Sequence, residues 1–546
     1  MTRPWYSHYD QQVPWFVNYP DISLPKLLEN SLAMWGDRIC LRYLDRLFSY
    51  REVSQQVEDI AYGLICFGLQ KGERVLLCLP NIPEFVASYF GILSAGGVVV
   101  ATNPLYKLPE IHTQIVDAGC RYVIGHSGNQ ILFETIMDST SLKGVIYVDV
   151  DPNQAQPFKD SRELQMVDII NLGKSRKIDL PNVSAGDPAV FQYSGGTTGN
   201  PKAAIGLHRN LVANAYQFRS WLVDLQDGKE KVLLAIPLYH VYGMVLGLCV
   251  GILLGAELIL QPDPRDVKKI LHLLKHHNIS FFPSVPAMLT ALVRDPDVQA
   301  EKYDLRSLRA CISGSAPLQP DTRIQFVRLT GANVMEGYGL SEAPTATHCN
   351  PMRGEKRDGS IGLPLPGVDC RIVDFEGRDI DLLSGEAGEL WIKGPQVMAG
   401  YHNQPDETAD VLQNGWLRTG DIVRMDEDGY FFIVDRKKDL IKVGGLQVWP
   451  REIEEVLLSH PAIAEAAVAG IPDQFSGERA KAWVVLKKGV ELSQEELIHW
   501  CGERLSSYKL PREIEYVESL PRTTVGKILR RELVRNHIQK NQTPPR

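Results

Sequence analysis

The chain has 546 residues, 44% of them hydrophobic, and a formal net charge of −8 from 58 basic and 66 acidic residues. This length corresponds to several domains, and the apolar content is sufficient for large cores. No block of basic residues stands out, which disfavours a nucleic-acid-binding protein, because such a surface needs clustered cations. The nine cysteines show no CxxC spacing and the first residues contain no apolar signal segment, so we expect a soluble cytoplasmic protein with reduced cysteines.

Short apolar runs alternate with longer helical patterns through the first part of the chain. This alternation predicts βαβ units in which helices cover parallel sheets, and therefore an α/β fold. The expected elements are a strand at Val75–Leu79, a helix at Glu84–Ala95, a strand at Val98–Ala101, a helix at Leu108–Ala118 and a strand at Tyr122–Ile124.

A glycine-rich segment, Tyr193–Lys202, holds three glycines, three Ser or Thr residues and a lysine within ten residues. Such a segment can wrap a polyphosphate, because glycines let backbone N–H groups approach the oxygens while hydroxyls donate and the lysine supplies charge. It is not the GxxxxGK[ST] P-loop, since Ala203 follows Lys202. Clusters of this composition are also common in plain surface loops, so phosphate binding depends on the rest of the chain.

The segment Val232–Ala256 contains no Asp, Glu, Lys or Arg and is long enough to span a bilayer. Pro237, Tyr239 and His240 interrupt it, so we favour buried elements over a membrane span. The expected elements are a strand at Val232–Ile236, a helix at Val241–Leu254 and a strand at Glu257–Leu260.

Within the expected helix, glycines recur every four residues at 243, 247, 251 and 255 and so share one helical face. The favoured interpretation is close packing of this face against a sheet. The alternative is that the smooth ridge leaves room for an alkyl chain running inward from His240.

After about Arg436 the pattern changes to that of a compact α+β unit of roughly a hundred residues, the size of a small domain. The charged run Asp435–Asp439 lies at the junction, where a solvated hinge is expected, and the polar tail Asn541–Arg546 is expected to be disordered. The expected elements are a helix at Pro450–Leu458, strands at Ile463–Gly470 and Ala482–Lys487, a helix at Gln494–Leu505 and a strand at Glu513–Val517.

Five further residues suit the binding and activation of a nucleotide. Tyr338 lies between glycines and offers an aromatic face for adenine, and Glu342 offers a hard oxygen ligand for Mg²⁺. Asp421 can accept hydrogen bonds from ribose hydroxyls, Arg436 has fixed donors for ribose or phosphate, and Lys527 is a mobile charge for a developing phosphoryl anion. Each residue alone could be a solvated side chain, a helix cap or part of the core, so the joint occurrence in this order carries the argument.

Taken together, these motifs resemble those of the adenylate-forming superfamily, which includes acyl-CoA synthetases, coumarate-CoA ligases, luciferases and adenylation domains of peptide synthetases. The resemblance extends from about Leu27 to about Leu533 and is greatest to bacterial long-chain fatty-acid–CoA ligases. The segments that carry it are Asn103–Tyr106, Gln192–Gly199, Ser313–Leu318, Glu336–Glu342, Lys393–Met398, Gly415–Asp421, Asp435–Asp439 and Val525–Arg531.

The resemblance implies a large N-terminal domain at residues 1–435 and a small, mobile C-terminal domain at residues 436–546, with a hinge at Lys438. It also implies two steps: a carboxylate attacks the α-phosphate of Mg·ATP to give acyl-AMP and pyrophosphate, and the CoA thiol then displaces AMP. ATP, Mg²⁺, CoA and a carboxylic acid are the implied ligands, and peripheral membrane contact and a homodimer remain open.

The resemblance assigns roles residue by residue. Lys527 would bridge the carboxylate and the α-phosphate, His240 would lie at the acyl-AMP carbonyl, and Lys442 would replace Lys527 after the domain rotates. The residues assigned to ATP are Ser194, Gly195, Gly196, Thr197, Thr198, Gly199, Asn200, Pro201, Lys202, Gly314, Ser315, Ala316, Pro317, Glu336, Gly337, Tyr338, Gly339, Leu340, Ser341, Asp421, Arg436 and Lys527. Those assigned to CoA are Gly444, Gly445 and Leu446, and those assigned to the metal are Glu342 and Thr197.

The chain departs from the family pattern in two places. Ala203 stands where Gly is common, and Leu207 stands where Ser or Thr is common, which puts ATP affinity in doubt but no assigned catalytic group. Gln447 and Lys442 match the coumarate-CoA ligase branch, which weakens the long-chain assignment.

We therefore expect a medium- to long-chain fatty acyl-CoA synthetase, with an aryl- or small-acyl-CoA ligase as the alternative. A peptide-synthetase loading domain is less favoured, because no carrier domain follows Lys527. A non-catalytic acyl-binding protein is disfavoured because Lys527, Glu342, Asp421 and Arg436 are all present.

Overall fold

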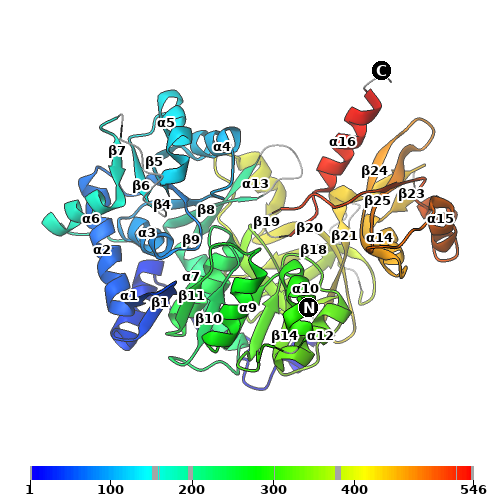
Figure 1. Ribbon diagram of the computed structural model, residues 1–546, viewed down its shortest axis with the longest axis horizontal. Helices are drawn as coiled ribbons and strands as arrows, with labels where there is room; N and C mark the ends of the chain where they lie inside the picture. Colours follow the sequence, from blue (N-terminus) through cyan, green and yellow to red (C-terminus); the bar gives the residue numbers. More distant parts are fainter. Residues whose placement is uncertain are drawn as a thin grey trace.

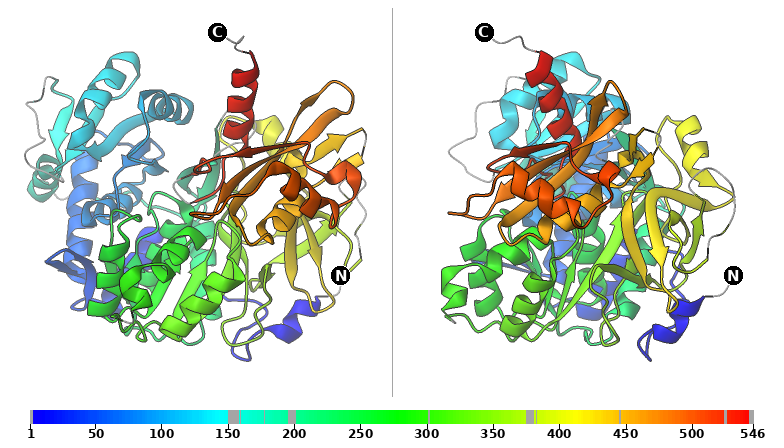
Figure 2. Two further views of the ribbon diagram at one scale, coloured as in Figure 1. Left: turned by 45° about the vertical axis from the view of Figure 1, so that its right-hand side comes forward. Right: turned by 90° about the vertical axis from the view of Figure 1, so that its right-hand side faces the viewer.

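The structure is a computed structural model that describes residues 3–149, 158, 160–176, 178–194, 201–300, 302–374, 381, 383–444, 446–523 and 526–542. A large N-terminal part is built on two sheets, and a smaller C-terminal part packs against one side of it, with the last helix extending outward (Figures 1 and 2). The α/β class and the division into a large and a small sheet unit are as predicted from the sequence.

The first sheet has seven strands in the order β7-β6-β5-β3-β4-β8-β9, and its neighbouring strands are parallel except for β8 and β9. Its strands are β3 (Arg74–Cys78), β4 (Val98–Ala101), β5 (Cys120–His126), β6 (Gly144–Val148), β7 (Glu163–Gln165), β8 (Pro188–Ser194) and β9 (Lys202–Leu207). The helices between them are α2 (Tyr50–Cys66), α3 (Pro83–Ser94), α4 (Leu108–Ala118), α5 (Gln130–Ser139) and α6 (Met166–Ser175).

The second sheet has fourteen strands, with β19 paired to β20 beside the path β17-β18-β20-β21-β16-β15-β14-β13-β12-β10-β11-β1-β2. Its strands are β1 (Ile39–Tyr43), β2 (Arg46–Ser49), β10 (Lys231–Leu234), β11 (Glu257–Leu260), β12 (Phe281–Ser284), β13 (Ala310–Ser313), β14 (Asn333–Leu340), β15 (Ala343–Cys349), β16 (Ser360–Pro364), β17 (Asp369–Val373), β18 (Gly388–Lys393), β19 (Leu412–Gln413), β20 (Trp416–Met425) and β21 (Phe431–Arg436).

Among the described residues, nine helical segments accompany the second sheet. They are α1 (Leu24–Trp35), α7 (His208–Trp221), η4 (Tyr242–Cys249), α8 (Val250–Leu253), α9 (Val267–His276), α10 (Pro286–Val293), α11 (Pro296–Gln299), α12 (Pro320–Thr330) and α13 (Pro405–Val411). Of these, η4 and α8 to α12 follow the parallel strands β10 to β13. Because β12, β13 and β14 are parallel, their carboxyl ends meet at one edge of the sheet, the usual position of a ligand site in such sheets.

The small C-terminal sheet has five strands, in the order β23-β22-β25-β24 with β26 paired to β25. Its strands are β22 (Ile441–Val443), β23 (Leu446–Val448), β24 (Ile463–Asp473), β25 (Gly477–Leu486) and β26 (Glu513–Tyr516), and its helices are α14 (Pro450–Leu458), α15 (Gln494–Gly502) and α16 (Arg530–Gln542). The short helical turn η5 (Lys437–Asp439) connects it to β21, the last strand of the large sheet.

The one expected helix that differs in kind is Val241–Leu254. Its first part, η4, is a π-helix, and only Val250–Leu253 is α-helical. Apolar periodicity cannot separate these two forms in a fully buried segment, because every residue of η4 is buried and no face is polar.

The glycines of this segment pack closely against their surroundings. A Cβ at Gly247 would lie 2.7 Å from Leu234 Cδ2 of β10, and one at Gly251 would overlap Leu258 Cδ2 of β11. The face that the glycines share therefore lies against the sheet. The favoured packing interpretation is confirmed, and the proposed alkyl groove along the ridge is wrong, because Leu234 and Leu258 fill that space.

No helix among the described residues has both the length and the apolar character needed to cross a bilayer. The segment after His240 is buried in the core, as expected. The nine cysteines are all unpaired, and eight of them are buried. Burial raises the pKa of Cys78 to about 12, which makes it an unreactive core residue, as the sequence indicated.

Candidate active site

Three of the predicted nucleotide-binding residues form one connected group at the carboxyl edge of the large sheet. The Tyr338 hydroxyl donates to Asp421 Oδ2 at 2.5 Å, and Arg436 Nε lies 2.9 Å from Asp421 Oδ1. Asp421 on β20 and Arg436 on β21 are direct partners across the antiparallel pair. Asp421 is buried, and the Arg436 charge compensates the cost of burying its carboxylate.

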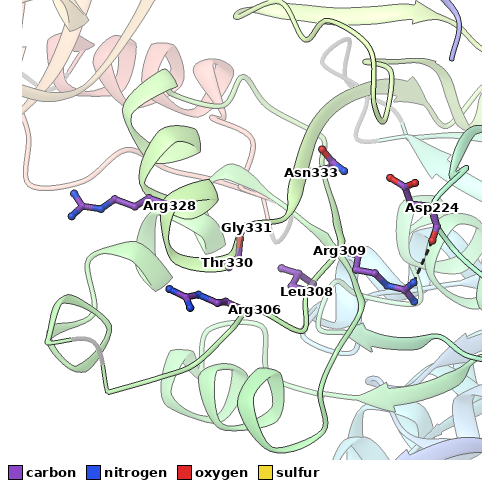
Figure 3. Close-up of a pocket in the computed structure, with 8 residues that line it drawn as sticks. All are labelled: Asp224, Arg306, Leu308, Arg309, Arg328, Thr330, Gly331 and Asn333. Carbon is purple, nitrogen blue, oxygen red and sulfur yellow. Dashed lines mark hydrogen bonds between the residues drawn. The ribbon is translucent and has the colours of Figure 1, made fainter.

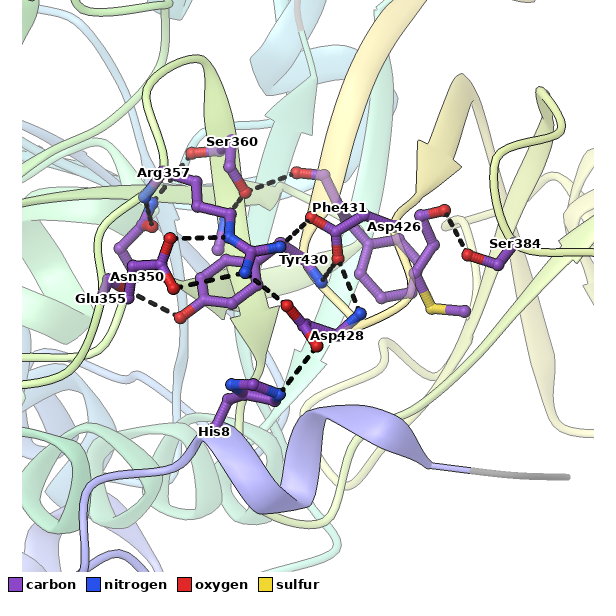
Figure 4. A network of polar contacts seen from close by, with 12 residues as sticks. His8, Asn350, Glu355, Arg357, Ser360, Ser384, Asp426, Asp428, Tyr430 and Phe431 are labelled. Atoms are coloured by element: carbon purple, nitrogen blue, oxygen red, sulfur yellow. Dashed lines mark hydrogen bonds and ion pairs between the residues drawn. The ribbon is translucent and has the colours of Figure 1, made fainter.

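The far end of the β20–β21 hairpin is anchored by an ion-pair network (Figure 4). Arg357 contacts Asp426 and Asp428 in the turn and lies 4.3 Å from the centre of the Tyr430 ring. His8, from the N-terminal turn η1 (Pro4–His8), lies 3.2 Å from Asp428. The network fixes the hairpin that carries Asp421 and Arg436, and no single residue of it could be assigned from sequence motifs.

The structure brings Lys527 of the small domain to His240 of the large domain. The Lys527 ammonium lowers the pKa of His240, after a larger effect of burial, to about 4. Burial and then the charge of Arg436 lower the pKa of Lys527 to about 8. The loop that carries Lys527 lies against α10, since a Cβ at Gly526 would be 3.6 Å from Ala287 Cβ.

His240 is held in one orientation and one tautomer. Its Nδ1 accepts a hydrogen bond from the Tyr242 amide at 3.2 Å, so a neutral ring carries its proton on Nε2. The imidazole is therefore neutral at pH 7 and has a proton to donate at Nε2.

The loop after β13 is tied to β14 by the half-buried carboxyl group of Glu336. Glu336 Oε2 accepts from the Leu318 amide at 3.0 Å, which holds the predicted segment Gly314–Pro317 beside Glu336–Leu340. Burial raises the pKa of Glu336 to about 7. Ser315 has a φ of 72°, a left-handed conformation that non-glycine residues rarely adopt, so the loop is held in a specific form.

Most of the glycine-rich loop lies outside the described residues: Gly195, Gly196, Thr197, Thr198, Gly199 and Asn200. Its two ends are described as the antiparallel strands β8 and β9, with Ser194 opposite Lys202. Ala203 is buried and its carbonyl accepts from the His402 amide at 2.9 Å. Leu207 begins the turn into α7, where its amide donates to Asn210 Oδ1 at 2.9 Å, so both departures from the family pattern are accommodated.

Glu342 lies in the turn between β14 and β15, and its Oε1 accepts from the Tyr401 hydroxyl at 2.8 Å. Within the described part of the chain, no three His, Cys, Asp or Glu side chains form a metal cage. One carboxylate fits Mg²⁺ in a site where substrate phosphates complete the coordination. Glu342 would then hold the ion through its other oxygen, and Thr197, the second predicted ligand, lies outside the described residues.

The residues predicted for the second step lie apart from this group. Lys442 on β22 and Leu446 on β23 have exposed side chains, and the Lys442 amide donates to Glu478 Oε2 at 2.8 Å. Gly444 has a φ of 58° in the turn between these strands, and Gly445 lies outside the described residues. Lys438 lies in η5, between the large and small sheets, and is exposed.

A cavity of about 520 Å³ opens at a different part of the molecule (Figure 3). Leu308 and Arg309 line it just before β13, and Asn333 lines it at the start of β14. It therefore lies at the amino ends of the strands whose carboxyl ends carry Ser313 and Glu336, and it contains none of the predicted site residues.

The matched family models agree with this architecture. Residues 28–402 match the model of the AMP-binding enzyme family, and residues 452–527 match that of the AMP-binding enzyme C-terminal domain. The chain therefore belongs to the AMP-binding enzyme family, as the motifs indicated.

Curated relatives are similar over nearly their whole length. A long-chain-fatty-acid–CoA ligase of Bacillus subtilis (strain 168) is 39% identical over 557 residues, covering 98% of this chain and 98% of the relative. A 4-coumarate–CoA ligase-like protein 9 of Oryza sativa subsp. japonica is 33% identical, covering 97% of this chain and 95% of the relative.

Solved structures have the same fold. ATP-bound MatB from Rhodopseudomonas palustris is 28% identical and superposes with a TM-score of 0.85 over 94% of this chain and 99% of that one. The apo form of MatB gives a TM-score of 0.75 over 95% and 99%. The arrangement of this chain is thus more similar to the ATP-bound form.

Proposed function

We propose that this protein converts a medium- to long-chain fatty acid into its acyl-CoA thioester through an acyl-AMP intermediate. The enzyme class, an AMP-forming acid–thiol ligase that uses ATP and CoA, was predicted from the motifs and is confirmed by the family and its full-length relatives. The observation that carries the proposal is the meeting of Lys527 and His240 at the group formed by Tyr338, Asp421 and Arg436.

The first step needs positive charge at the α-phosphate. A carboxylate oxygen of the fatty acid attacks the α-phosphorus, the bond to the bridging oxygen breaks, and pyrophosphate leaves. Lys527 would neutralise the charge that accumulates there, because electrostatic stabilisation supplies most of the catalysis of phosphoryl transfer. Asp421 would accept from the ribose hydroxyls, Arg436 would hold Asp421 and the nucleotide, and Tyr338 would pack against adenine.

Pyrophosphate would leave from the glycine-rich loop, where Ser194–Lys202 would hold the β- and γ-phosphates. Mg²⁺, when bound, supplies further neutralisation of these phosphates. Glu342 would hold that ion and Thr197 would add a hydroxyl, while Gly314–Pro317 and Glu336–Ser341 would enclose adenine and the α-phosphate.

The second step places a thiol at the acyl carbon. The thiol releases its proton to solvent as the sulfur bonds to that carbon, the carbon–oxygen bond to AMP breaks, and AMP leaves. His240 would donate from Nε2 to the acyl carbonyl, a role that its neutral tautomer can fill while Nδ1 accepts from the Tyr242 amide. Rotation at Lys438 would withdraw Lys527 and bring Lys442 to the site, with Gly444–Leu446 along the pantetheine path.

Alkyl substrates are favoured over aryl substrates by the higher identity to the long-chain ligase of Bacillus subtilis. The second candidate is an aryl- or small-acyl-CoA ligase, which the rice relative and the Lys442–Gln447 segment favour. We further propose a cytoplasmic location. Peripheral membrane contact and homodimerisation are separate proposals, to be checked by vesicle sedimentation and by light scattering.

The test is pyrophosphate and AMP release with Mg·ATP across acids from acetate to oleate, with coumarate and benzoate, each with and without CoA. We expect CoA-dependent turnover that peaks between C8 and C18 acids. A peak at coumarate or benzoate would replace the proposal with the second candidate. Pyrophosphate release that does not depend on CoA would indicate a different acceptor.

A further inference from the structure

Tyr401 contacts both Glu342 and Lys202, two residues proposed to act on the phosphates of ATP and their metal ion. No sequence motif indicated Tyr401. Its hydroxyl donates to Glu342 Oε1 at 2.8 Å. Its ring lies 5.5 Å from the Lys202 ammonium, which is also paired with Glu407. The two charged groups that Tyr401 contacts are Lys202, the last residue of the glycine-rich segment, and Glu342, the carboxylate proposed to hold Mg²⁺.

The segment at residues 398–408, here called the strap, connects the two sheets at this point. At its start the Met398 amide donates to the Glu342 carbonyl at 2.8 Å. The next residues pair with β9, through Ala399 N to Ile205 O and Ile205 N to Gly400 O, both at 2.9 Å. The strap is therefore bonded on one side to the turn that carries Glu342 and on the other to the strand that leaves the glycine-rich loop.

Tyr401 itself is fixed within the strap. It forms a bridge with Ala204 of β9, and its amide donates to Thr408 Oγ1 at 2.9 Å. The Tyr401 hydroxyl is the donor in its contact with Glu342, because an ionised carboxylate can only accept a hydrogen bond. With its backbone held at two points, the side chain has little freedom to move away from the carboxylate.

We propose that Tyr401 is a positioning residue that orients the Glu342 carboxylate for Mg²⁺ and couples it to Lys202. By donating to Oε1, the hydroxyl would leave Oε2 available to the metal and would hold the Glu342 side chain in one rotamer. Partners that orient a metal-binding side chain in this way are commonly worth 10- to 100-fold in metal affinity. This inference rests on the proposed role of Glu342.

The test measures binding rather than turnover. Tyr401→Phe removes only the hydroxyl and keeps the ring beneath Lys202. Calorimetry with a non-hydrolysable ATP analogue, at a series of Mg²⁺ concentrations and in EDTA, gives the affinity with and without metal. We expect the Mg²⁺ concentration for half-maximal enhancement to rise about tenfold, with the affinity in EDTA unchanged.

Tyr147→Phe is the matched control, because Tyr147 on β6 also donates to a glutamate, Glu163 of β7, at 2.9 Å. It should leave the Mg²⁺ dependence as in the wild type. Glu342→Gln tests the proposed metal role itself. Thermal melting and circular dichroism establish that each variant is folded.

Two results would overturn the role of Tyr401 while leaving that of Glu342 intact. One is a wild-type Mg²⁺ dependence in Tyr401→Phe when Glu342→Gln has lost it. The other is an equal loss of affinity with and without metal, which would indicate general packing of the strap. If Glu342→Gln keeps the wild-type Mg²⁺ dependence, the metal assignment fails first and the role of Tyr401 fails with it.

Discussion

The surroundings of Lys527 disfavour the charged form of its side chain. Its ammonium is half-buried, and the nearby charges of Arg436 and Lys438 oppose protonation more than Asp421 and Asp439 favour it. The result is a lysine whose pKa is lowered to about 8 in the absence of substrate. Such a group gains charge stabilisation when a phosphate arrives, so its tendency to bind the anion is greatest where the chemistry occurs.

This pKa predicts a limit on the alkaline side of adenylation. As pH rises through about 8, Lys527 loses its proton, and kcat/KM for acyl-AMP formation should fall, since this ratio reports ionisation of the free enzyme. ATP–pyrophosphate exchange measured from pH 6 to 10 would show the decline. Lys527→Arg should move the decline beyond pH 10, because guanidinium stays protonated. A profile that is flat to pH 10 in the wild-type enzyme would contradict the assignment.

At the scale of elements, the sequence was informative wherever local pattern decides the structure. The strand Val98–Ala101 and the helix Pro450–Leu458 have the predicted bounds, because their apolar periods and flanking Gly and Pro residues are local signals. The π-helix η4 could not be predicted, because it depends on the fit of Gly243–Gly251 to the sheet beneath. Tyr401 was missed because its partner Glu342 is 59 residues away.

The packing of η4 and α8 predicts that Gly251→Ala destabilises the large domain. The new methyl would overlap Leu258 Cδ2, and Leu258 is fully buried and cannot move freely. Overpacking of this kind costs about 1–3 kcal/mol, measurable by urea unfolding. Gly502→Ala at the end of α15 is the control, since a methyl there meets nothing within 4 Å. If the free energy of unfolding of Gly251→Ala equals that of the wild type, the interface between α8 and β11 can accommodate an extra methyl group.

Asp435 connects the two domains through a helix end. Its Oδ2 accepts from the Arg451 amide in the first turn of α14 at 2.7 Å, while Oδ1 accepts from the Arg436 amide at 2.7 Å. Trp449, the residue before α14, makes no side-chain cap. A carboxylate from the large sheet thus caps a helix of the small domain in the arrangement that brings Lys527 to the site.

Asp435→Ala should therefore slow acyl-AMP formation more than thioester formation from supplied acyl-AMP. Loss of a helix cap costs about 1 kcal/mol, which corresponds to about a fivefold change in the balance between two orientations. Stopped-flow measurement of each half-reaction gives the ratio. Glu452→Ala is the control, since Glu452 in the same turn pairs with Lys509 inside the small domain. An equal slowing of both half-reactions would exclude the orientation effect.

At the scale of the whole molecule, the sequence indicates where the large and small domains divide. It does not indicate how the two domains fit together. The change in sequence pattern after Arg436 coincides with the end of β21, the last strand of the large sheet, where η5 leads to β22. The seating of Gly526 against Ala287 and of Asp435 against Arg451 depends on complementary surfaces formed by residues far apart in the chain. Motifs therefore indicated Lys527 as a candidate residue, but only the assembled domains explain how it is brought to His240.

The contact between Gly526 and Ala287 predicts that one disulfide can hold the two domains in a single relative orientation. A Cβ at Gly526 would lie 3.6 Å from Ala287 Cβ, within the range of about 3.5–4.5 Å found in disulfides. Ala287→Cys with Gly526→Cys should, when oxidised, retain acyl-AMP formation and lose thioester formation, and a reductant should restore both. The strain of a cysteine at the φ of 83° of Gly526 makes the bond easy to reduce.

Single-turnover measurements of both half-reactions, before and after reduction, decide the outcome. The single variants Ala287→Cys and Gly526→Cys are the controls, and the native cysteines should add little background because eight of the nine are buried. If the oxidised enzyme forms the thioester as fast as the enzyme whose disulfide has been reduced, Lys527 need not leave the site between the two steps. The loss of that step alone would establish that the small domain must move between them, because the bond removes no group from either site and constrains only how the two domains are arranged.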